Sequence, residues 1–280
     1  MRDAVISMPP AVDQHERRLG AVDEHLVSLL EPTSFAADQY RTIRHVVEGM
    51  HPTKKVLAVT SAVPGDGKTT TAINLAGALA HAADARILLC DLDLRTPSME
   101  KRLGLDARTP GFADMVLNAG LTLDDMIWQH PRFRLSILPA GRSPTVPYEL
   151  LESPRLAEIL HEARERYDYV VLDTPPLAPV PDSRVIAGHV DGVLMVVSAH
   201  KTPRKLLEDT LSILDPTKVI GIVFNNDDRP LSGYYGYYGY GYGSHHHRGR
   251  GAQPRENGHR TSMLDTALGR FKSWLGRPHE

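Results

Sequence analysis

Short apolar runs and helical repeats alternate along most of the chain. Six runs are nearly continuous in Val, Ile, Leu and similar residues, and each has the length of a strand. These predicted strands are residues 56–60, 86–91, 135–138, 169–173, 192–198 and 219–225. Strands that are apolar on both faces are typical of buried parallel sheets. The pattern therefore predicts an α/β fold, a doubly wound and mostly parallel sheet with helices on both faces.

Between these strands, apolar residues recur at helical spacing. Ser34 can cap a first helix in which Ala36, Tyr40, Ile43 and Val47 recur at that spacing. Further helices are predicted at 69–81, 148–167 and 203–214, with shorter helical pieces at 98–103, 112–117 and 123–128. The apolar stretch 185–199 contains His189 and Asp191, so it is interpreted as a helix end followed by a buried strand.

The composition changes toward both ends. Residues 1–32 are mixed and charged, and we expect a loosely held arm there, with a short helix at 26–30 as an alternative. The α/β domain is predicted over 33–229. Residues 230–260 are rich in Gly and Tyr and contain no branched aliphatic residue after Leu231, which predicts a flexible tail. Residues 261–280 are predicted as an amphipathic helix that either lies on an anionic membrane surface or packs on protein.

Charge and cysteine content exclude several classes. The net charge of −2 gives no general attraction to nucleic acid, so no nucleic-acid partner is expected. The single cysteine, Cys90, lies in an apolar run and cannot form an internal disulfide, which suits a reducing compartment. No signal peptide and no apolar window of bilayer length is evident, so we expect a cytoplasmic chain without its own membrane span.

The segment after the first strand has the features of a phosphate-binding loop. It reads Ser-Ala-Val-Pro-Gly-Asp-Gly-Lys-Thr-Thr and leads into a helix. Small residues let backbone N–H groups surround an anion, Lys68 can reach phosphate oxygens, and the Thr69 hydroxyl can bind Mg²⁺. The predicted nucleotide-binding residues of this loop are Pro64, Gly65, Asp66, Gly67, Lys68, Thr69 and Thr70. Ala62 stands where the general pattern has glycine, and the alternative is an ordinary strand-to-helix turn.

Carboxylates end two of the predicted strands. Alternation places Asp91 and Asp93 on one side, where they can hold Mg²⁺ or accept a hydroxyl proton; strand-end solvation or helix capping is the alternative. Asp173 follows Tyr-Val-Val-Leu, as in a Walker B strand that orders a metal shell. Asn225, at the end of the last strand, is a candidate for base recognition or simply a turn former. The three motifs in this order predict a P-loop NTPase site for Mg²⁺ and nucleotide.

These motifs resemble the cytoplasmic domain of the bacterial tyrosine kinases, the BY-kinase family of capsule and exopolysaccharide autokinases. The resemblance covers residues 33–242 and includes the phosphate loop, where the family tolerates a residue other than Gly at its first position. It also includes Leu-Leu-Cys-Asp-Leu-Asp-Leu-Arg, Val-Val-Leu-Asp-Thr-Pro-Pro, and Pro147-Tyr-Glu-Leu-Leu, which Val146 precedes in place of Asn. The helix segment Asp38-Gln-Tyr-Arg-Thr-Ile-Arg resembles a ring-assembly motif of the family, with Asp in place of Glu.

The resemblance implies an ATP-dependent, Mg²⁺-assisted protein-tyrosine autokinase. Lys68, Asp91, Asp93 and Asp173 would be catalytic, with Thr69, Asp91 and Asp173 at the metal and Asp91 or Asp93 taking the tyrosine proton. Asp38, Arg41 and Arg44 would make ring contacts. The phosphoacceptors would be tail tyrosines of a neighbouring subunit: Tyr234, Tyr235, Tyr237, Tyr238, Tyr240 and Tyr242.

The implied partners are other copies in a ring, a separate transmembrane activator or polysaccharide co-polymerase, and a protein-tyrosine phosphatase. The expected location is the inner face of the plasma membrane. Each tail phosphate adds about −1.5 to −2 charges, so we expect phosphorylation to loosen docking at an Asp-lined site. The alternative function is a non-kinase ATPase switch like the septum-positioning and partition ATPases. Those proteins carry a signature lysine where this chain has Val63, and they lack a tyrosine tail.

Overall fold

The computed structural model describes residues 20–49, 56–82, 85–105 and 109–227. The chain divides into two units, Met1–Asp227 and Asp228–Glu280, and every described residue belongs to the first. The predictions for 1–19, for the tail at 230–260 with its six tyrosines, and for the helix at 261–280 therefore lie outside the described residues.

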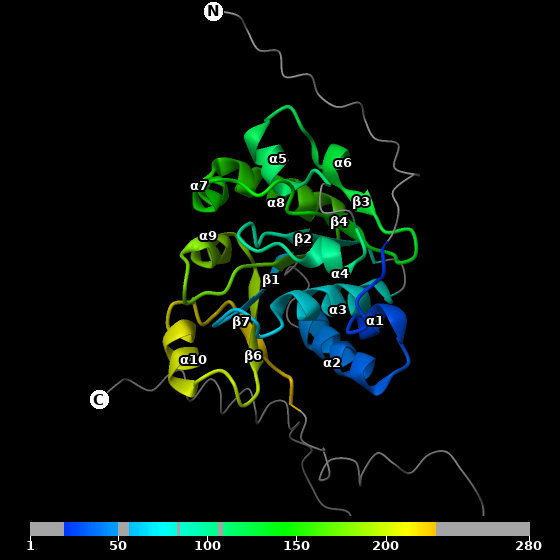
Figure 1. The fold of residues 1–280 in the computed structure, drawn as a ribbon, viewed down its shortest axis with the longest axis vertical. Coiled ribbons are helices and arrows are strands. Elements are labelled where there is room, and N and C mark those ends of the chain that lie inside the picture. Colours follow the sequence, from blue (N-terminus) through cyan, green and yellow to red (C-terminus); the bar gives the residue numbers. More distant parts are fainter. Residues whose placement is uncertain (1–19, 50–55, 83–84, 106–108, 228–280) are drawn as a thin grey trace, which may run out of the picture. The chain divides into compact units, whose positions relative to one another are not determined.

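One seven-stranded sheet forms the centre of the described domain, with strand order β3-β4-β2-β5-β1-β6-β7 (Figure 1). The strands are β1 (Val56–Ser61), β2 (Ile87–Asp91), β3 (Trp128–Gln129), β4 (Ser136–Leu138), β5 (Tyr169–Asp173), β6 (Gly192–Ser198) and β7 (Val219–Asn225). Neighbouring strands are parallel except for β3, which is antiparallel to β4. The predicted doubly wound, mostly parallel sheet is confirmed.

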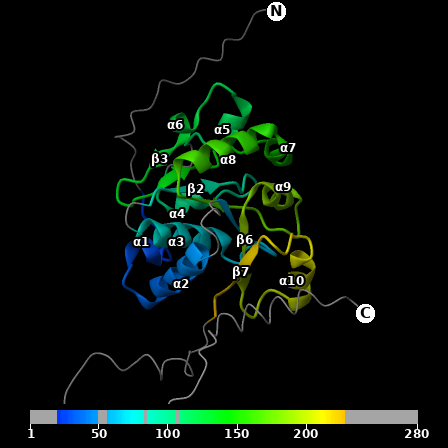
Figure 2. The ribbon, with the colours of Figure 1, turned by 180° about the vertical axis from the view of Figure 1, so that it is seen from behind.

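Helices cover both faces of this sheet because its strands are buried on both sides. The helices are α1 (Val27–Leu30), α2 (Phe35–Gly49), α3 (Lys68–Ala80), α4 (Met99–Arg102), α5 (Phe112–Leu117), α6 (Leu123–Met126), α7 (Pro147–Glu152), α8 (Pro154–Arg166), α9 (Asp182–His189) and α10 (Arg204–Leu211). One core joins α1 to α4 to one face, and the other joins α5 to α10 to the opposite face. Figures 1 and 2 show α1, α2 and α3 on one side of the sheet and α5 to α8 on the other.

All six predicted strands are present, with ends within one residue of the prediction. The short edge strand β3 was not predicted, and it replaces the end of the helical piece expected at 123–128 because Ile127 has extended backbone, with φ −71° and ψ 132°. The single helix predicted at 148–167 is wrong. It is two helices, because Ser153 is extended and Pro154, which has no N–H to donate, begins α8.

The expectation of a loosely held arm over 1–32 does not hold for residues 20–32, which pack on the domain. Leu26 is fully buried against α3. The Ser28 N–H donates to Asn74 Oδ1 at 2.8 Å, and Asn74 Nδ2 donates to the His25 carbonyl at 2.9 Å. A side chain of α3 therefore holds this segment at both ends of the α1 turn. The short helix expected there as an alternative is present as α1.

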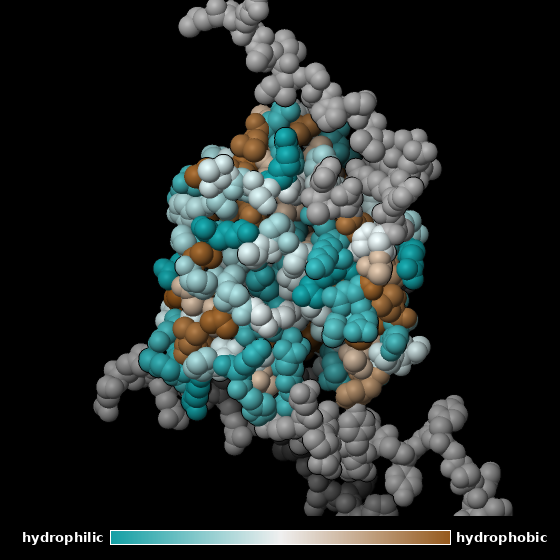
Figure 3. Space-filling model, in the orientation of Figure 1, coloured by the Kyte–Doolittle hydropathy of each residue, from teal (hydrophilic) through white to brown (hydrophobic). Residues whose placement is uncertain are grey.

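The visible surface of the domain is mainly hydrophilic. On the face in Figure 3, apolar residues form small separate groups rather than one continuous patch. Within the described ranges, none of the helices combines the length and hydropathy required to cross a bilayer.

Candidate nucleotide and phosphotransfer site

The sheet order brings the three sequence motifs to one edge. Strands β1, β5 and β2 are neighbours, and Asp91 is paired in register with Asp173 on the adjacent strand. The phosphate loop begins where β1 ends at Ser61. Because these strands are parallel, their carboxyl ends meet at the same edge, which is where doubly wound sheets bind ligands. The predicted gathering of these motifs is confirmed.

The loop leads into α3 through a glycine that other residues cannot replace. Gly67 has φ +95°, and a Cβ there would lie 2.0 Å from Asn225 Nδ2. Helix α3 starts at Lys68 without a side-chain cap on its first turn. The first N–H groups of a helix have no partner inside it, and together with the helix dipole they attract anions. This helix end therefore fits a phosphate group.

Ala62 occupies a buried position that does not require glycine. Its side chain is fully buried, and its carbonyl accepts from the Ala178 N–H at 3.3 Å. The positive φ values of the loop occur at Gly65 and Gly67, not at Ala62. A small residue suffices at the first position of this loop.

Lys68 is held by an acidic group in the site. Its Nζ lies 2.6 Å from Asp93 Oδ2, and both side chains are largely shielded from solvent. Burial alone would lower the pKa of Lys68, but the nearby charges of Asp173, Asp93 and Asp91 together raise it. The lysine is therefore an ammonium group at working pH, positioned at the start of α3.

Asp91 and Asp93 also shape the connection that follows β2. Asp91 Oδ1 accepts from the Asp93 N–H at 3.0 Å, and Oδ2 accepts from the Met99 N–H at 3.3 Å. Asp93 Oδ1 accepts from the Thr96 N–H at 3.1 Å. Burial, followed by the negative charge of Asp173, raises the pKa of Asp91 well above its ordinary value. Asp91 therefore accepts from the first N–H of α4, as the capping alternative predicts, whereas Asp93 accepts from a residue in the turn before that helix.

Asp173 is the least satisfied acid of the site. It is fully buried, and neither carboxylate oxygen has a hydrogen-bond partner among the described residues. Burial raises the pKa of Asp173 to about 6, and the nearby positive charge of Lys68 opposes the rise only in part. Two orphaned buried oxygens are the kind of donor that a hard cation such as Mg²⁺ binds.

The donor set fits a magnesium ion that nucleotide phosphates help to hold. In the part of the chain that the structure describes, no three His, Cys, Asp or Glu side chains form a ready metal cluster. Mg²⁺ usually takes one or two carboxylates, with phosphate oxygens and waters completing its shell. Asp173 and Thr69, whose Oγ1 accepts from Ser98 Oγ at 3.2 Å, suit that role. Asp91 is the poorer candidate because both of its oxygens already accept backbone N–H groups.

Two residues predicted to contact the nucleotide brace the loop in this structure. Asp66 is buried, and its Oδ1 accepts from Thr202 Oγ1 at 2.7 Å and from the Ser198 N–H at 3.3 Å. The Asn225 amide donates to the Asp66 carbonyl at 3.0 Å. Through Oδ1 the side chain of Asp66 fastens the loop to the connection after β6, whereas its Oδ2 is buried without a hydrogen-bond partner among the described residues. Asn225 supports the same loop. This contact is structural, as in the alternative to base recognition, and base recognition by Asn225 stays a prediction.

The other loop positions differ in exposure. Pro64 and Gly65 are exposed, whereas Thr69 is buried and Thr70 is partly buried. The Thr70 carbonyl accepts from Asn74 Nδ2 at 2.9 Å, which ties the first turn of α3 to the residue that holds α1.

The sequence reasoning did not identify the ion pair between Arg95 and Asp182. Arg95 Nε and Nη2 donate to the two oxygens of Asp182 at 2.7 and 2.9 Å, and Asp182 is fully buried at the start of α9. This fork joins the segment after β2 to the helix that precedes β6. Arg95 stands in the quoted second motif, but its partner is 87 residues away and no sequence spacing signals it.

The predicted assembly residues on α2 do not share one environment. Arg41 pairs with Asp38 and donates to the Pro32 carbonyl, and both side chains of the pair are about half exposed. Arg44 turns to its own domain, where Nη1 donates to the Ala78 carbonyl at 3.1 Å and Nε lies 3.1 Å from Glu48 Oε1. Asp38 and Arg41 are thus available to a partner, and Arg44 is largely committed to α3.

The chain is similar in sequence to proteins of known activity. A family model described as an AAA domain matches residues 54–201. The tyrosine-protein kinase YwqD of Bacillus subtilis (strain 168) is 32% identical over 228 residues, covering 80% of this chain and 95% of YwqD. The succinoglycan biosynthesis transport protein ExoP of Rhizobium meliloti (strain 1021) is 34% identical over 231 residues, which are 78% of this chain and 28% of ExoP.

Solved structures show the same relationship. The VpsO kinase domain is 30% identical with a TM-score of 0.63, over 72% of this chain and 95% of that domain. A ParA family ATPase from Chlorobium tepidum TLS, 23% identical with a TM-score of 0.51, over 61% of this chain and 74% of that one, shares the fold alone. With a phosphate loop, paired second-motif carboxylates and a Walker B aspartate at one sheet edge, and a kinase relative matched over nearly its whole length, the chain belongs to the bacterial tyrosine-protein kinase family.

Proposed function

We propose that this chain is an ATP-dependent tyrosine kinase that phosphorylates the tyrosine-rich tails of neighbouring copies of itself. One observation carries the proposal. The Lys68 ammonium lies 2.6 Å from Asp93 at the uncapped start of α3, and the orphaned carboxylate of Asp173 lies at the same sheet edge. This combination offers cationic and backbone donors for phosphate beside acids for a metal and a proton.

Each residue of the site has a distinct part in phosphoryl transfer. Backbone N–H groups from Gly65 to Thr69 would surround the nucleotide phosphates, and Lys68 would stabilise charge on the transferring group. Thr69 and Asp173 would hold Mg²⁺, which neutralises phosphate charge when bound. Catalysis of this kind depends mainly on positioning and electrostatics, so the braces on the loop contribute by fixing its shape.

A tyrosine hydroxyl must lose its proton as it attacks. We assign this step to Asp91 because, unlike Asp93, it is not paired with Lys68, and because burial raises its pKa above that of an ordinary aspartate. Asp93 is engaged by Lys68 and the Thr96 N–H, so its main part is to position the lysine. An Asp91→Asn variant should lose phosphorylation while still binding nucleotide, whereas Asp93→Asn should weaken both.

The regulated process is proposed to be the polymerisation and export of an exopolysaccharide or capsule. ExoP is named for succinoglycan biosynthesis and transport, and that name supports the proposal for this chain.

We propose that the kinase works at the inner face of the plasma membrane as a homo-oligomeric ring with a separate transmembrane activator, a polysaccharide co-polymerase. Asp38 and Arg41, which are exposed on α2, would contribute to the ring. A protein-tyrosine phosphatase would reverse the modification, and tail phosphorylation would loosen the assembly.

Phosphotyrosine formation tests the catalytic proposal. The full chain is incubated with MgATP, and phosphotyrosine is measured together with ATP hydrolysis. Lys68→Met should abolish the phosphotyrosine signal. The matched control Lys205→Met removes an exposed lysine on α10 and should leave it unchanged. Hydrolysis of ATP without phosphotyrosine would instead favour the non-kinase ATPase switch.

A mixing experiment tests transfer between copies. One chain carries Lys68→Met with its tail tyrosines intact, and the other is active but has Phe at all six tail tyrosines. Neither should become phosphorylated alone. Phosphotyrosine on the Lys68→Met chain after mixing supports transfer between copies, and its absence contradicts that part of the proposal.

A further inference from the structure

A second polar cavity opens at the opposite edge of the sheet. It has a volume of about 470 Å³ and is lined by Ala85, Arg86, Ile87, Gln129, Arg134, Ser136, Arg166 and Tyr167. These residues precede or begin β2, β4 and β5, or end the antiparallel strand β3. The nucleotide site lies at the carboxyl ends of β2 and β5. At about 3.3 Å per residue, their five residues separate the two edges by roughly 16 Å.

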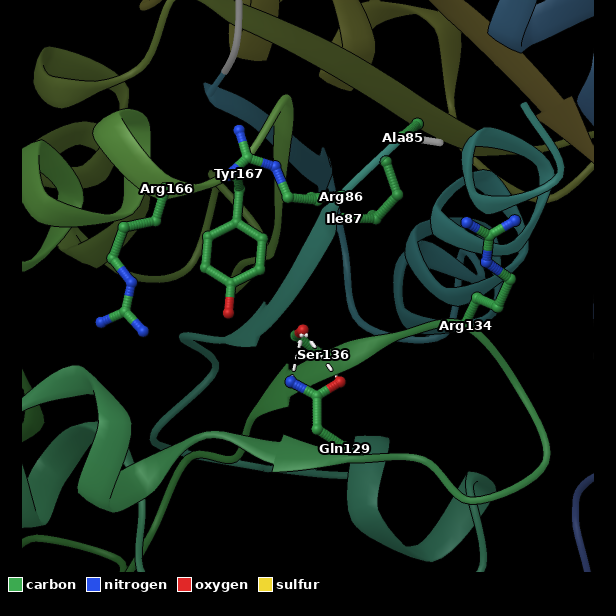
Figure 4. Close-up of a pocket in the computed structure, with 8 residues that line it drawn as sticks. All are labelled: Ala85, Arg86, Ile87, Gln129, Arg134, Ser136, Arg166 and Tyr167. Atoms are coloured by element: carbon green, nitrogen blue, oxygen red, sulfur yellow. Dashed lines mark hydrogen bonds between the residues drawn. The ribbon is translucent and has the colours of Figure 1, made fainter. Parts of the chain in front are cut away.

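The middle of the cavity offers uncharged hydrogen-bonding groups. Gln129 Nε2 donates to Ser136 Oγ at 2.8 Å, and the hydroxyl and amide oxygen lie 3.1 Å apart. The Tyr167 hydroxyl points toward this pair (Figure 4) and makes no hydrogen bond to any described residue. The ring of Tyr167 is buried, so its hydroxyl is held in place. Amide and hydroxyl groups fixed in this way suit the hydroxyl groups of a ligand.

Arginines surround this centre on more than one side. Figure 4 shows Arg166 on one side of the cavity and Arg134 on the other, with the Arg86 guanidinium above the Tyr167 ring in this view. Guanidinium groups bind phosphate and carboxylate through paired hydrogen bonds. Because the cations are spread around the cavity, they fit a ligand whose anionic groups are separated better than they fit one small anion.

The three arginines are not equally free. Arg86 lies 3.5 Å from Asp168, and Arg166 pairs with Asp124 and with Glu162, the latter at 2.9 Å. Those carboxylates do not line the cavity. Arg134 is exposed and makes no ion pair with any described residue. Arg134 is therefore the cation that a ligand gains without breaking an existing pair.

We propose that this cavity binds a small hydroxyl-rich molecule carrying two separated anionic groups, the chemistry of a sugar bisphosphate. The uncharged centre receives the hydroxyl groups, and Arg134 and its opposing arginines receive the anions. The site is distinct from the nucleotide site and does not depend on the kinase function proposed above.

The test is calorimetric titration of the full chain with fructose 1,6-bisphosphate. It is carried out in a Lys68→Met background so that the phosphate loop does not hold the probe. Binding at one site is expected, and Arg134→Gln should weaken it about tenfold or more because charge-assisted hydrogen bonds are lost. The matched control Arg132→Gln removes an adjacent exposed arginine that lies over the Phe133 ring and does not line the cavity, and it should change the affinity less than twofold.

Five results would overturn the proposal. The first is no binding of the bisphosphate at millimolar concentration, and the second is an equal effect of Arg134→Gln and Arg132→Gln. The third is inorganic phosphate binding as tightly as the bisphosphate, which would indicate a site for one small anion. The fourth is a hexaglutamate peptide binding more tightly, which would indicate a surface for acidic protein segments. Uncharged fructose should show no binding, and binding equal to that of the bisphosphate would also contradict the assignment.

Discussion

The buried charge of Asp173 should make the free protein less stable than a chain that lacks it. The ordinary pKa of an aspartate is 3.8, and in this fold the pKa of Asp173 is about 6. Because the folded state holds the proton more tightly, ionisation of this carboxyl destabilises the fold. The free energy of unfolding begins to fall as pH rises through 3.8, and the fall is complete above about 6. At 1.36 kcal/mol per pH unit, the gap corresponds to about 3 kcal/mol.

Replacing Asp173 with asparagine removes this charge and keeps the size of the side chain. We expect Asp173→Asn to raise the free energy of unfolding by about 2–3 kcal/mol at pH 8, and by roughly half as much at pH 5. The same variant should lose kinase activity, because it lacks the carboxylate proposed to hold the metal. Stability and function are opposed at this residue, as is common where an active site stores an unfavourable group.

The assay is urea unfolding of the full chain without nucleotide or magnesium, at pH 8 and at pH 5. Comparing variant with parent at each pH cancels the titration of all other groups that the substitution does not affect. The control Asp209→Asn removes a surface carboxylate that pairs with exposed Lys205, and it should give no gain at either pH. An Asp173→Asn chain that is no more stable than the parent at pH 8, or equally stabilised at both pH values, would refute the reasoning.

Five further substitutions test other contacts. Gly67→Ala should abolish nucleotide binding in equilibrium dialysis and cost about 1–3 kcal/mol of stability, because its φ and the adjacent side chain exclude a Cβ. Asp66→Ala should raise the KM for ATP severalfold in the kinase assay, and an unchanged KM would contradict its bracing role. Leu26→Ala should lower the free energy of unfolding in urea by about 2–5 kcal/mol. A decrease below about 0.5 kcal/mol, a quarter of the smallest expected value, would mean that the α1 segment is not part of the core. Arg44→Ala should lower stability, whereas Arg41→Ala should leave stability unchanged and weaken self-association in sedimentation velocity.

Much of the fold could be predicted because its strands are apolar on both faces. A parallel strand that is buried on both faces must be apolar at nearly every position, so the pattern predicts the ends of six strands to within one residue. Prediction failed where a local feature decided the structure. Pro154 splits one helical repeat into two helices, and β3 is only two residues long, too short to show a period. The sequence pattern does not predict that residues 20–32 pack on the domain, because α3 holds Leu26 and Ser28 in place. Ser28 and its partner Asn74 are 46 residues apart in the sequence.

The chemistry of the site follows from the sequence motifs alone. Lys68, Thr69, Asp91, Asp93 and Asp173 follow strands whose order and parallel direction require their ends to meet, and the structure brings them together. The sequence can predict this meeting of the motifs because each motif is one continuous segment at the end of a strand.

The separate roles of those residues depend on how the chain packs in three dimensions. It engages both oxygens of Asp91 with backbone N–H groups, leaves both oxygens of Asp173 without partners, and turns Asp66 and Asn225 into braces of the loop. It also joins Arg95 to Asp182 and places three arginines around a cavity far from the nucleotide edge. Burial, pKa and ion pairing depend on which distant segments surround a side chain, and that surrounding is set by packing rather than by neighbours in sequence.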